Sequence, residues 1–115
     1  MAIDGVYSAR FISNSKEAGA GIVVIDGATL HGGDTDYLYK GKYRFVDDQG
    51  GISVTVDVDN YSGRRSAVVG PFDRFRLTLT GKTAQQGFLL SGAVDGYADR
   101  TIQIDLKRIS DLVTE

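Results

Sequence analysis

The sequence contains no cysteine and only one histidine. Without cysteine, a disulfide scaffold, a thiolate metal site and a cysteine nucleophile are all excluded. One histidine cannot supply a zinc site built from several histidines. No apolar run approaches the roughly 18 residues that a membrane-spanning helix needs. These absences favour a protein that holds no metal.

The chain also lacks a strong excess of either charge, because its formal net charge is only -2. A protein that binds polyanions without specificity carries a clear basic excess, so we expect no direct contact with nucleic acid. The first ten residues, MAIDGVYSAR, lack the basic and apolar regions of a secretion signal. We therefore expect a cytoplasmic protein that makes no contact with a membrane. A length of 115 residues fits a single domain over 1–115.

Strict alternation of apolar and polar residues is the strongest pattern in the chain. In 52–59, Ile52, Val54, Val56 and Val58 alternate with polar residues, which is the period of a half-buried strand. Similar segments lie at 37–45, 75–80 and 101–107, and weaker ones at 5–13, 20–26, 28–32 and 86–94. No window of a dozen residues has a helical period.

Turn signals separate these eight segments. Asp26-Gly27 indicates a tight hairpin, and the residues from Gly81 to Gln86 are expected to connect the sixth and seventh strands. Residues 61–72 read as a loop or a short helical turn. Eight amphipathic strands in sequence can hide their apolar faces and their edges by closing on themselves. The predicted fold is all-β, an eight-stranded antiparallel up-and-down barrel, and a two-sheet sandwich is the rival.

The segment 37–45 places four aromatic residues on one face, Tyr37, Tyr39, Tyr43 and Phe45. The residues at the alternate positions of this segment are mostly basic, so the aromatic face is expected to point into the barrel. Buried phenols need hydrogen-bond partners, which other side chains, water or a ligand can supply. These four residues are therefore the candidate ligand-facing positions, with simple filling of the interior as the favoured interpretation.

Two interpretations, one catalytic and one of cofactor binding, fail on sequence context. His31 with Asp34 could act as a base and its orienting group, but no nucleophile motif accompanies them. Gly19-Ala20-Gly21 precedes a strand and not a helix, so it is no dinucleotide-binding motif. We predict no catalytic residue, no cofactor and no enzyme activity.

The segment that starts with Asp57 and Asp59 resembles the beginning of a calcium-binding loop. The sixth and twelfth positions should then be glycine and glutamate, but they are Ser62 and Val68. The two aspartates are better explained as the solvent face of an alternating strand, and no metal site is predicted.

An ordered set of short motifs adds a resemblance. Asp4-Gly5-Val6-Tyr7 leads to Phe11-Ile12-Ser13-Asn14, and then come Gly19-Ala20-Gly21-Ile22-Val23, Gly32-Gly33-Asp34 and Tyr39-Lys40-Gly41. This order resembles the GrlR family, named for a negative regulator of type III secretion in attaching-and-effacing enterobacteria. The resemblance covers about 4–41 and fades after Asn60-Tyr61.

The resemblance implies a lipocalin-like barrel that forms a homodimer. It also implies that a helix-turn-helix transcriptional activator is bound and silenced through four acidic residues in the loop after the Tyr-x-Gly strand. At that place this chain offers only Asp47 and Asp48, which are the candidate partner-binding residues. The loop 47–51 is expected to protrude, to be mobile and to tolerate substitution.

The predicted function is therefore a GrlR-like regulatory binding protein of the bacterial cytoplasm, acting by protein–protein interaction as a negative regulator of a transcriptional activator. The alternative is a lipocalin-like carrier or sensor that holds a small apolar ligand inside the barrel. A cavity of ligand size would favour the carrier, whereas a filled interior with an exposed patch would favour the protein partner. A hydrolase or isomerase built in the barrel is the third and weakest hypothesis.

Overall fold

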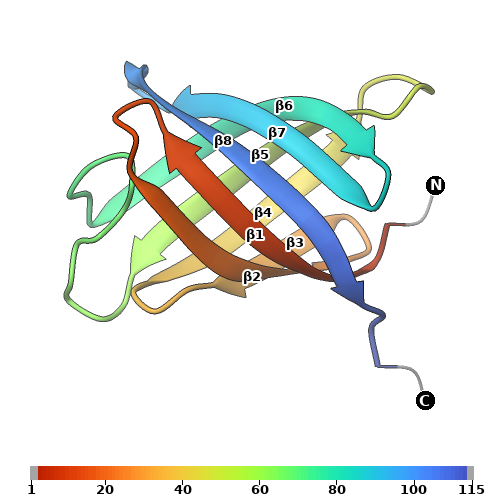
Figure 1. Ribbon diagram of the computed structural model, residues 1–115, viewed down its shortest axis with the longest axis horizontal. Coiled ribbons are helices and arrows are strands. Elements are labelled where there is room, and N and C mark those ends of the chain that lie inside the picture. Colours follow the sequence, from red (N-terminus) through yellow and green to blue (C-terminus); the bar gives the residue numbers. More distant parts are fainter. Residues whose placement is uncertain (1–2, 114–115) are drawn as a thin grey trace.

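The computed structural model describes residues 3–113, and within that range it contains eight antiparallel strands and no helix. The strands are β1 (Gly5–Ser13), β2 (Ala18–Asp26), β3 (Thr29–Gly33), β4 (Tyr37–Phe45), β5 (Gly51–Asn60), β6 (Arg74–Ala84), β7 (Gly87–Val94) and β8 (Tyr97–Ser110). Each pairs with the next along the chain, and β8 pairs with β1, so the sheet closes (Figure 1). The predicted eight-stranded barrel is confirmed, and the sandwich is excluded. The described residues include no helix that could cross a membrane.

The alternation seen in the sequence becomes the two sides of the barrel wall. Val54 of β5 faces Leu79 of β6, and their exposed fractions are only 2% and 1%. Their neighbours Ser53 and Thr80 lie opposite each other on the outer side. The core is therefore the barrel interior, and the wall is one residue thick.

Gly81 lies inside a strand, so the predicted connection between the sixth and seventh strands is wrong in its extent. β6 continues to Ala84, and only two residues separate it from β7. Gly81 pairs with Leu90. A Cβ atom at this position would lie 1.9 Å from the carbonyl oxygen of Leu89. The glycine therefore allows the two strands to approach closely. In a sequence, a glycine with this role cannot be told from a glycine in a turn.

The hairpin predicted at Asp26-Gly27 is present. β2 ends at Asp26, and Gly27 is the first of the two residues that connect it to β3. Its φ of 64° lies in the left-handed region, as the first turn position of a type II′ hairpin requires.

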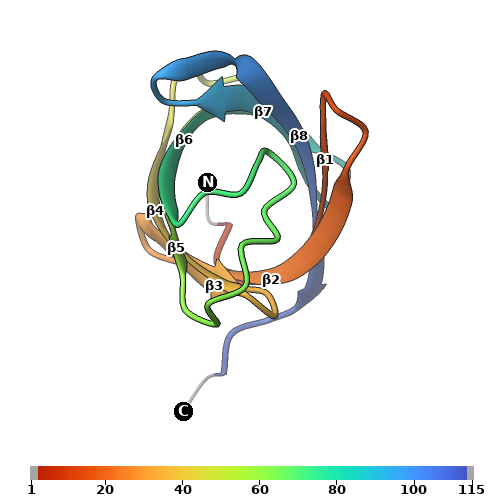
Figure 2. The same ribbon diagram turned by 90° about the vertical axis from the view of Figure 1, so that its left-hand side faces the viewer.

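Both ends of the barrel are covered. The segment 61–73, between β5 and β6, crosses the opening that faces the viewer in Figure 2. It is a loop without a helical turn, and it buries Val68 and Val69 in the core. At the opposite end Ile3 is buried, and its carbonyl oxygen accepts a hydrogen bond of 2.7 Å from the hydroxyl of Tyr7. We call 61–73 the plug loop.

Candidate functional site

The four aromatic residues of β4 lie on its inner side. Tyr37 is 2% exposed, and Tyr39, Tyr43 and Phe45 are half-buried and packed against the core. The alternate residues of the strand are all exposed. The strand runs the length of the barrel, so Tyr37 and Tyr39 border the central cavity whereas Tyr43 and Phe45 do not. The structure therefore divides the predicted set into two pairs.

The phenol groups are satisfied by the protein itself. The hydroxyl of Tyr37 donates to the carbonyl oxygen of Phe72 in the plug loop at 2.7 Å. That of Tyr43 donates to the carbonyl oxygen of Gly27 at 2.6 Å. The hydroxyl of Tyr39 donates to the carboxylate of Asp34. These bonds hold the rings in place without a ligand.

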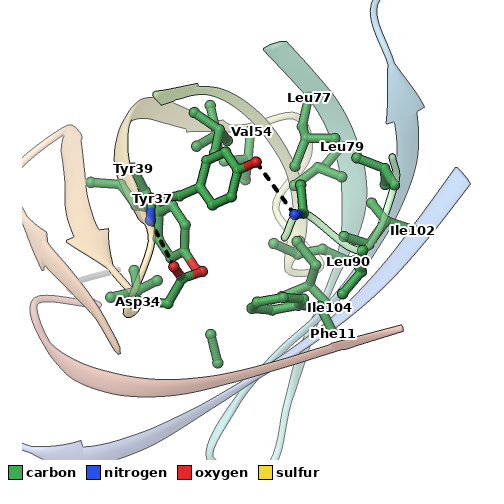
Figure 3. A pocket seen from close by; sticks show the side chains of 18 of the residues that line it. Phe11, Asp34, Tyr37, Tyr39, Val54, Leu77, Leu79, Leu90, Ile102 and Ile104 are labelled. Atoms are coloured by element: carbon green, nitrogen blue, oxygen red, sulfur yellow. Dashed lines mark hydrogen bonds between the residues drawn. The ribbon is translucent and has the colours of Figure 1, made fainter. Parts of the chain in front are cut away.

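The cavity inside the barrel has a volume of about 70 Å³. Pockets that hold a drug-sized ligand usually measure about 300–1,000 Å³. An engineered cavity of about 150 Å³ is known to admit benzene. The lining is almost wholly apolar, with Phe11, Leu77, Leu90 and Ile104 around it (Figure 3). The interior is therefore largely filled by side chains.

Asp34 is the charged residue in this lining, and it organises the turn before β4. One carboxylate oxygen accepts the backbone N–H groups of Asp36 and Tyr37 at 2.9 and 2.8 Å. The other accepts the hydroxyl of Tyr39. Burial, together with the neighbouring carboxylate, raises the pKa of the Tyr39 hydroxyl well above its usual range. The Tyr39 hydroxyl therefore keeps its proton at neutral pH and donates it in the hydrogen bond to Asp34.

Asp36 holds the plug loop in place. Its carboxylate accepts hydrogen bonds from the hydroxyls of Ser62, at 2.8 Å, and Ser66. These hydroxyls lower the pKa of the Asp36 carboxyl. Its backbone oxygen accepts the N–H of Tyr61 at 3.0 Å. Sequence reasoning missed this anchor, although Asp34-Thr35-Asp36 before a strand is typical of a turn in which an aspartate caps backbone groups.

The acidic loop 47–51 differs from its prediction. One oxygen of Asp47 accepts the backbone N–H groups of Gln49 and Gly51 at 2.9 and 2.8 Å. Gly50 and Gly51 are buried, and the carbonyl oxygen of Gly50 accepts the N–H of Thr83 at 2.9 Å. The expectation that this loop buries nothing is wrong, because Gly50 and Gly51 are buried and Asp47 caps the loop. Asp48 is exposed.

His31 and Asp34 do not form a catalytic pair in the described part of the chain. His31 is exposed opposite Lys40, whereas the carboxylate of Asp34 is engaged with Asp36, Tyr37 and Tyr39. Over residues 3–113, no group of three acidic or histidine side chains is placed to hold a metal ion.

Asp57 and Asp59 lie on the outer face of β5, each bound to an arginine of β6. Asp57 pairs with Arg76 at 2.7 Å and Asp59 with Arg74 at 3.1 Å. The hydrogen bond from Arg76 lowers the pKa of the Asp57 carboxyl. These carboxylates serve strand-to-strand ion pairs.

Apolar side chains gather on the outside of β1, β2 and β4. Ile12, Ile22 and Leu38 are 40%, 44% and 48% exposed. Ile22, Gly33 and Leu38 are neighbours in one row across β2, β3 and β4. We call Ile12, Ala18, Ala20, Ile22 and Leu38 the outer apolar patch. A contiguous apolar surface is typical of an interaction site.

The outer apolar patch adjoins an incompletely paired strand. β3 pairs with β2 only over 22–26, so the first four residues of β2 pair with β1 alone. An open strand edge beside apolar side chains is a surface that another chain can cover. The sequence showed β3 to be short, but it could not show which part of β2 is left without a neighbour.

No protein-family model matches the chain, and no curated protein matches it.

Proposed function

We propose that the chain is a non-enzymatic regulatory binding protein, similar in its mode of action to the GrlR family. It acts in the bacterial cytoplasm by protein–protein contact, as a negative regulator of a transcriptional activator of the helix-turn-helix type. The barrel is then a lipocalin-like scaffold whose outside does the binding. The observation that carries this proposal is the outer apolar patch beside the open edge of β2, on a barrel whose interior is largely filled.

The same observation supports a homodimer. In a two-fold dimer the same patch of both copies is buried, so Ile22 and Leu38 would be covered together with the open edge. Covering an open edge with a second copy also prevents unspecific pairing with other strands.

Asp48 is the charge of the acidic loop that remains available to a basic partner, since Asp47 caps the loop. A single exposed carboxylate steers a basic surface only weakly, and salt screens the attraction. Recognition of the activator through this loop therefore relies on additional contacts.

The test is affinity capture with the tagged chain from the bacterium that encodes it, followed by a reporter assay. We expect a DNA-binding activator to be captured and transcription from its promoter to fall when the chain is present. Capture without any transcription factor, or an unchanged reporter in the presence of the captured factor, would refute the proposed function. The variant Ala93→Ser, a small change on the outside of β7, is the control and should give the same capture and the same reporter activity as the wild type.

A small-ligand function is the second candidate, favoured by the apolar lining of the cavity. The cavity would have to grow, and the plug loop is the part that can leave, because it belongs to no strand and hydrogen bonds such as those to Asp36 secure it to the barrel end. Native mass spectrometry of the chain purified from its host tests this candidate. A bound apolar molecule of stoichiometric amount would support the carrier, and a mass equal to that of the chain alone would count against it.

A further inference from the structure

Three basic side chains stand in a row on the outside of β4. Lys40, Lys42 and Arg44 are exposed, and they alternate with the inward aromatic residues. Alternate residues of a strand are about 6.8 Å apart, so the three charges span roughly 14 Å. We call Lys40, Lys42 and Arg44 the basic row. β4 is paired with β3 and β5 on its two sides, so its backbone is fixed.

The basic row has no acidic partners of its own. Within residues 3–113 none of its members forms an ion pair, whereas Arg74 and Arg76 on β6 each pair with an aspartate of β5. Asp57 stands opposite Lys40, but its two oxygens accept hydrogen bonds from Arg76 at 2.7 and 3.3 Å. β4 therefore presents three exposed positive charges that form no ion pair among the described residues, although the charge of Asp57 acts on Lys40.

The basic row also borders a hollow in the outer surface. The hollow is open to solvent and extends over β3 to β6, and Asp57 and Arg76 line it together with the basic row. Hydroxyl groups of Thr29, Ser53 and Thr55 line it beside the charges. Hydroxyls and cations together provide hydrogen-bond donors for carboxylate oxygens.

We propose that the basic row is the docking site for an acidic, extended segment of a protein partner, with carboxylates at alternate positions. An extended peptide presents every second side chain on one face at the same period as β4, so three carboxylates can meet the three cations. This inference rests on the proposed function, since it assumes that the chain works by protein–protein contact. It assigns a partner chemistry opposite to that which the acidic loop would attract.

A polyanion such as single-stranded nucleic acid fits this face less well. Binding of a single strand uses aromatic platforms for the bases, and the rings of β4 point to the inside.

The experiment measures binding of fluorescent peptides by anisotropy at low and physiological salt. The probe is Glu-Thr-Glu-Thr-Glu, and its isomer Glu-Glu-Glu-Thr-Thr has the same charge without the alternate spacing. The double variant Lys40→Gln, Lys42→Gln removes two charges of the basic row. The matched control is Lys82→Gln, Lys107→Gln, which removes two exposed lysines from β6 and β8.

We expect the alternating peptide to bind, and its affinity to fall about tenfold in the basic-row variant but by less than about twofold in the control. The isomer should bind more weakly than the probe, and binding should weaken with salt. Equal loss in both double variants, equal affinity for the isomer, or no binding at low salt would overturn the inference. So would tighter binding of a thymidine pentanucleotide than of the probe.

Failure here and failure of the proposed function can be told apart. If the peptide does not bind but the activator is still captured and silenced, the basic row is not the docking site, and the proposed function stands. If neither is observed, both are refuted.

Discussion

Successive side chains of β4 point alternately into the barrel and into solvent, because the wall of the barrel is a single sheet. Tyr39 is half-buried and donates its hydroxyl to Asp34, whereas Lys42, three residues later, stands in solvent between Thr29 and Thr55. The same kind of substitution should thus have very different costs at the two positions.

Tyr39→Asp should destabilise the protein by about 3 kcal/mol or more, because it puts a carboxylate into the apolar interior beside Asp34. Lys42→Asp, on the outside of the same strand, should cost less than about 1 kcal/mol. Urea unfolding of both variants measures the difference. Equal midpoints would mean that the side chain of Tyr39 does not face the interior.

Asp47 makes stability depend on pH. Its carboxyl pKa is lowered, first by the hydrogen bond from the N–H of Gly51 and then by that from Gln49. The folded state therefore binds this proton less readily than the unfolded state, whose carboxyl pKa is about 4. The stabilisation is fully present above that value and is lost as the pH falls through the lower pKa of the folded state.

Asp47→Asn should therefore melt below the wild type at pH 7, and the difference should shrink as the pH is lowered from about 5 to 3. Asp48→Asn is the control, because Asp48 is exposed and caps no backbone group in the described structure. The measurement is the melting temperature of the wild type and of both variants across this pH range. A constant difference between wild type and Asp47→Asn would show that the carboxylate does not cap the loop.

At the scale of elements, the plug loop is the part of the barrel held least by strand pairing. It contributes Val68 and Val69 to the core, and Asp36 binds it through Ser62 and Ser66. A segment secured by a few side-chain bonds opens more easily than the strands around it.

Asp36→Ala should release the plug loop while the barrel stays closed. We expect faster hydrogen exchange at the amides of 61–73 and stronger fluorescence of a hydrophobic dye, because Val68 and Val69 become accessible. Asp73→Ala is the matched control, since Asp73 is exposed and its ion pair with Arg65 is long, at 3.9 Å. Unchanged exchange in Asp36→Ala would show that the other contacts of the loop, such as the hydrogen bonds of Tyr37 to Phe72 and of Arg100 to Val69, hold it without Asp36.

At the scale of the whole molecule, the barrel has a filled interior and two contrasting outer surfaces. The outer apolar patch lies over β1, β2 and the start of β4, and the basic row follows along β4. Apolar contact and charge can therefore serve different partners at the same time: a second copy at the patch and an acidic segment at the basic row.

The proposed dimer can be broken at the patch. Ile22→Glu should shift the protein from dimer to monomer in light scattering at tens of micromolar, because it would place a carboxylate of each copy in the apolar contact of the proposed dimer. Thr101→Glu, an exposed position on β8, should leave the mass unchanged. A wild-type protein that is already monomeric at this concentration would refute the homodimer.

The sequence by itself determined the all-β class and the inner and outer faces of the strands, whereas the choice between barrel and sandwich came from the closure of the sheet. A period of two is a local property, so Val54 and Tyr37 could be assigned to the interior without knowledge of their neighbours. The Asp26-Gly27 hairpin was likewise readable from two residues.

Only the tertiary structure decided what depends on distant parts of the chain. Asp47 and Asp48 are equivalent in sequence, yet the fold of the loop ties up one carboxylate and leaves the other exposed. Gly81 looked like a turn until the approach of Leu89 gave it a place within a strand. The size of the cavity depends on the plug loop, which enters the core from 61–73. Hydrogen bonds and packing between segments far apart in sequence carry these differences, and no local pattern records them.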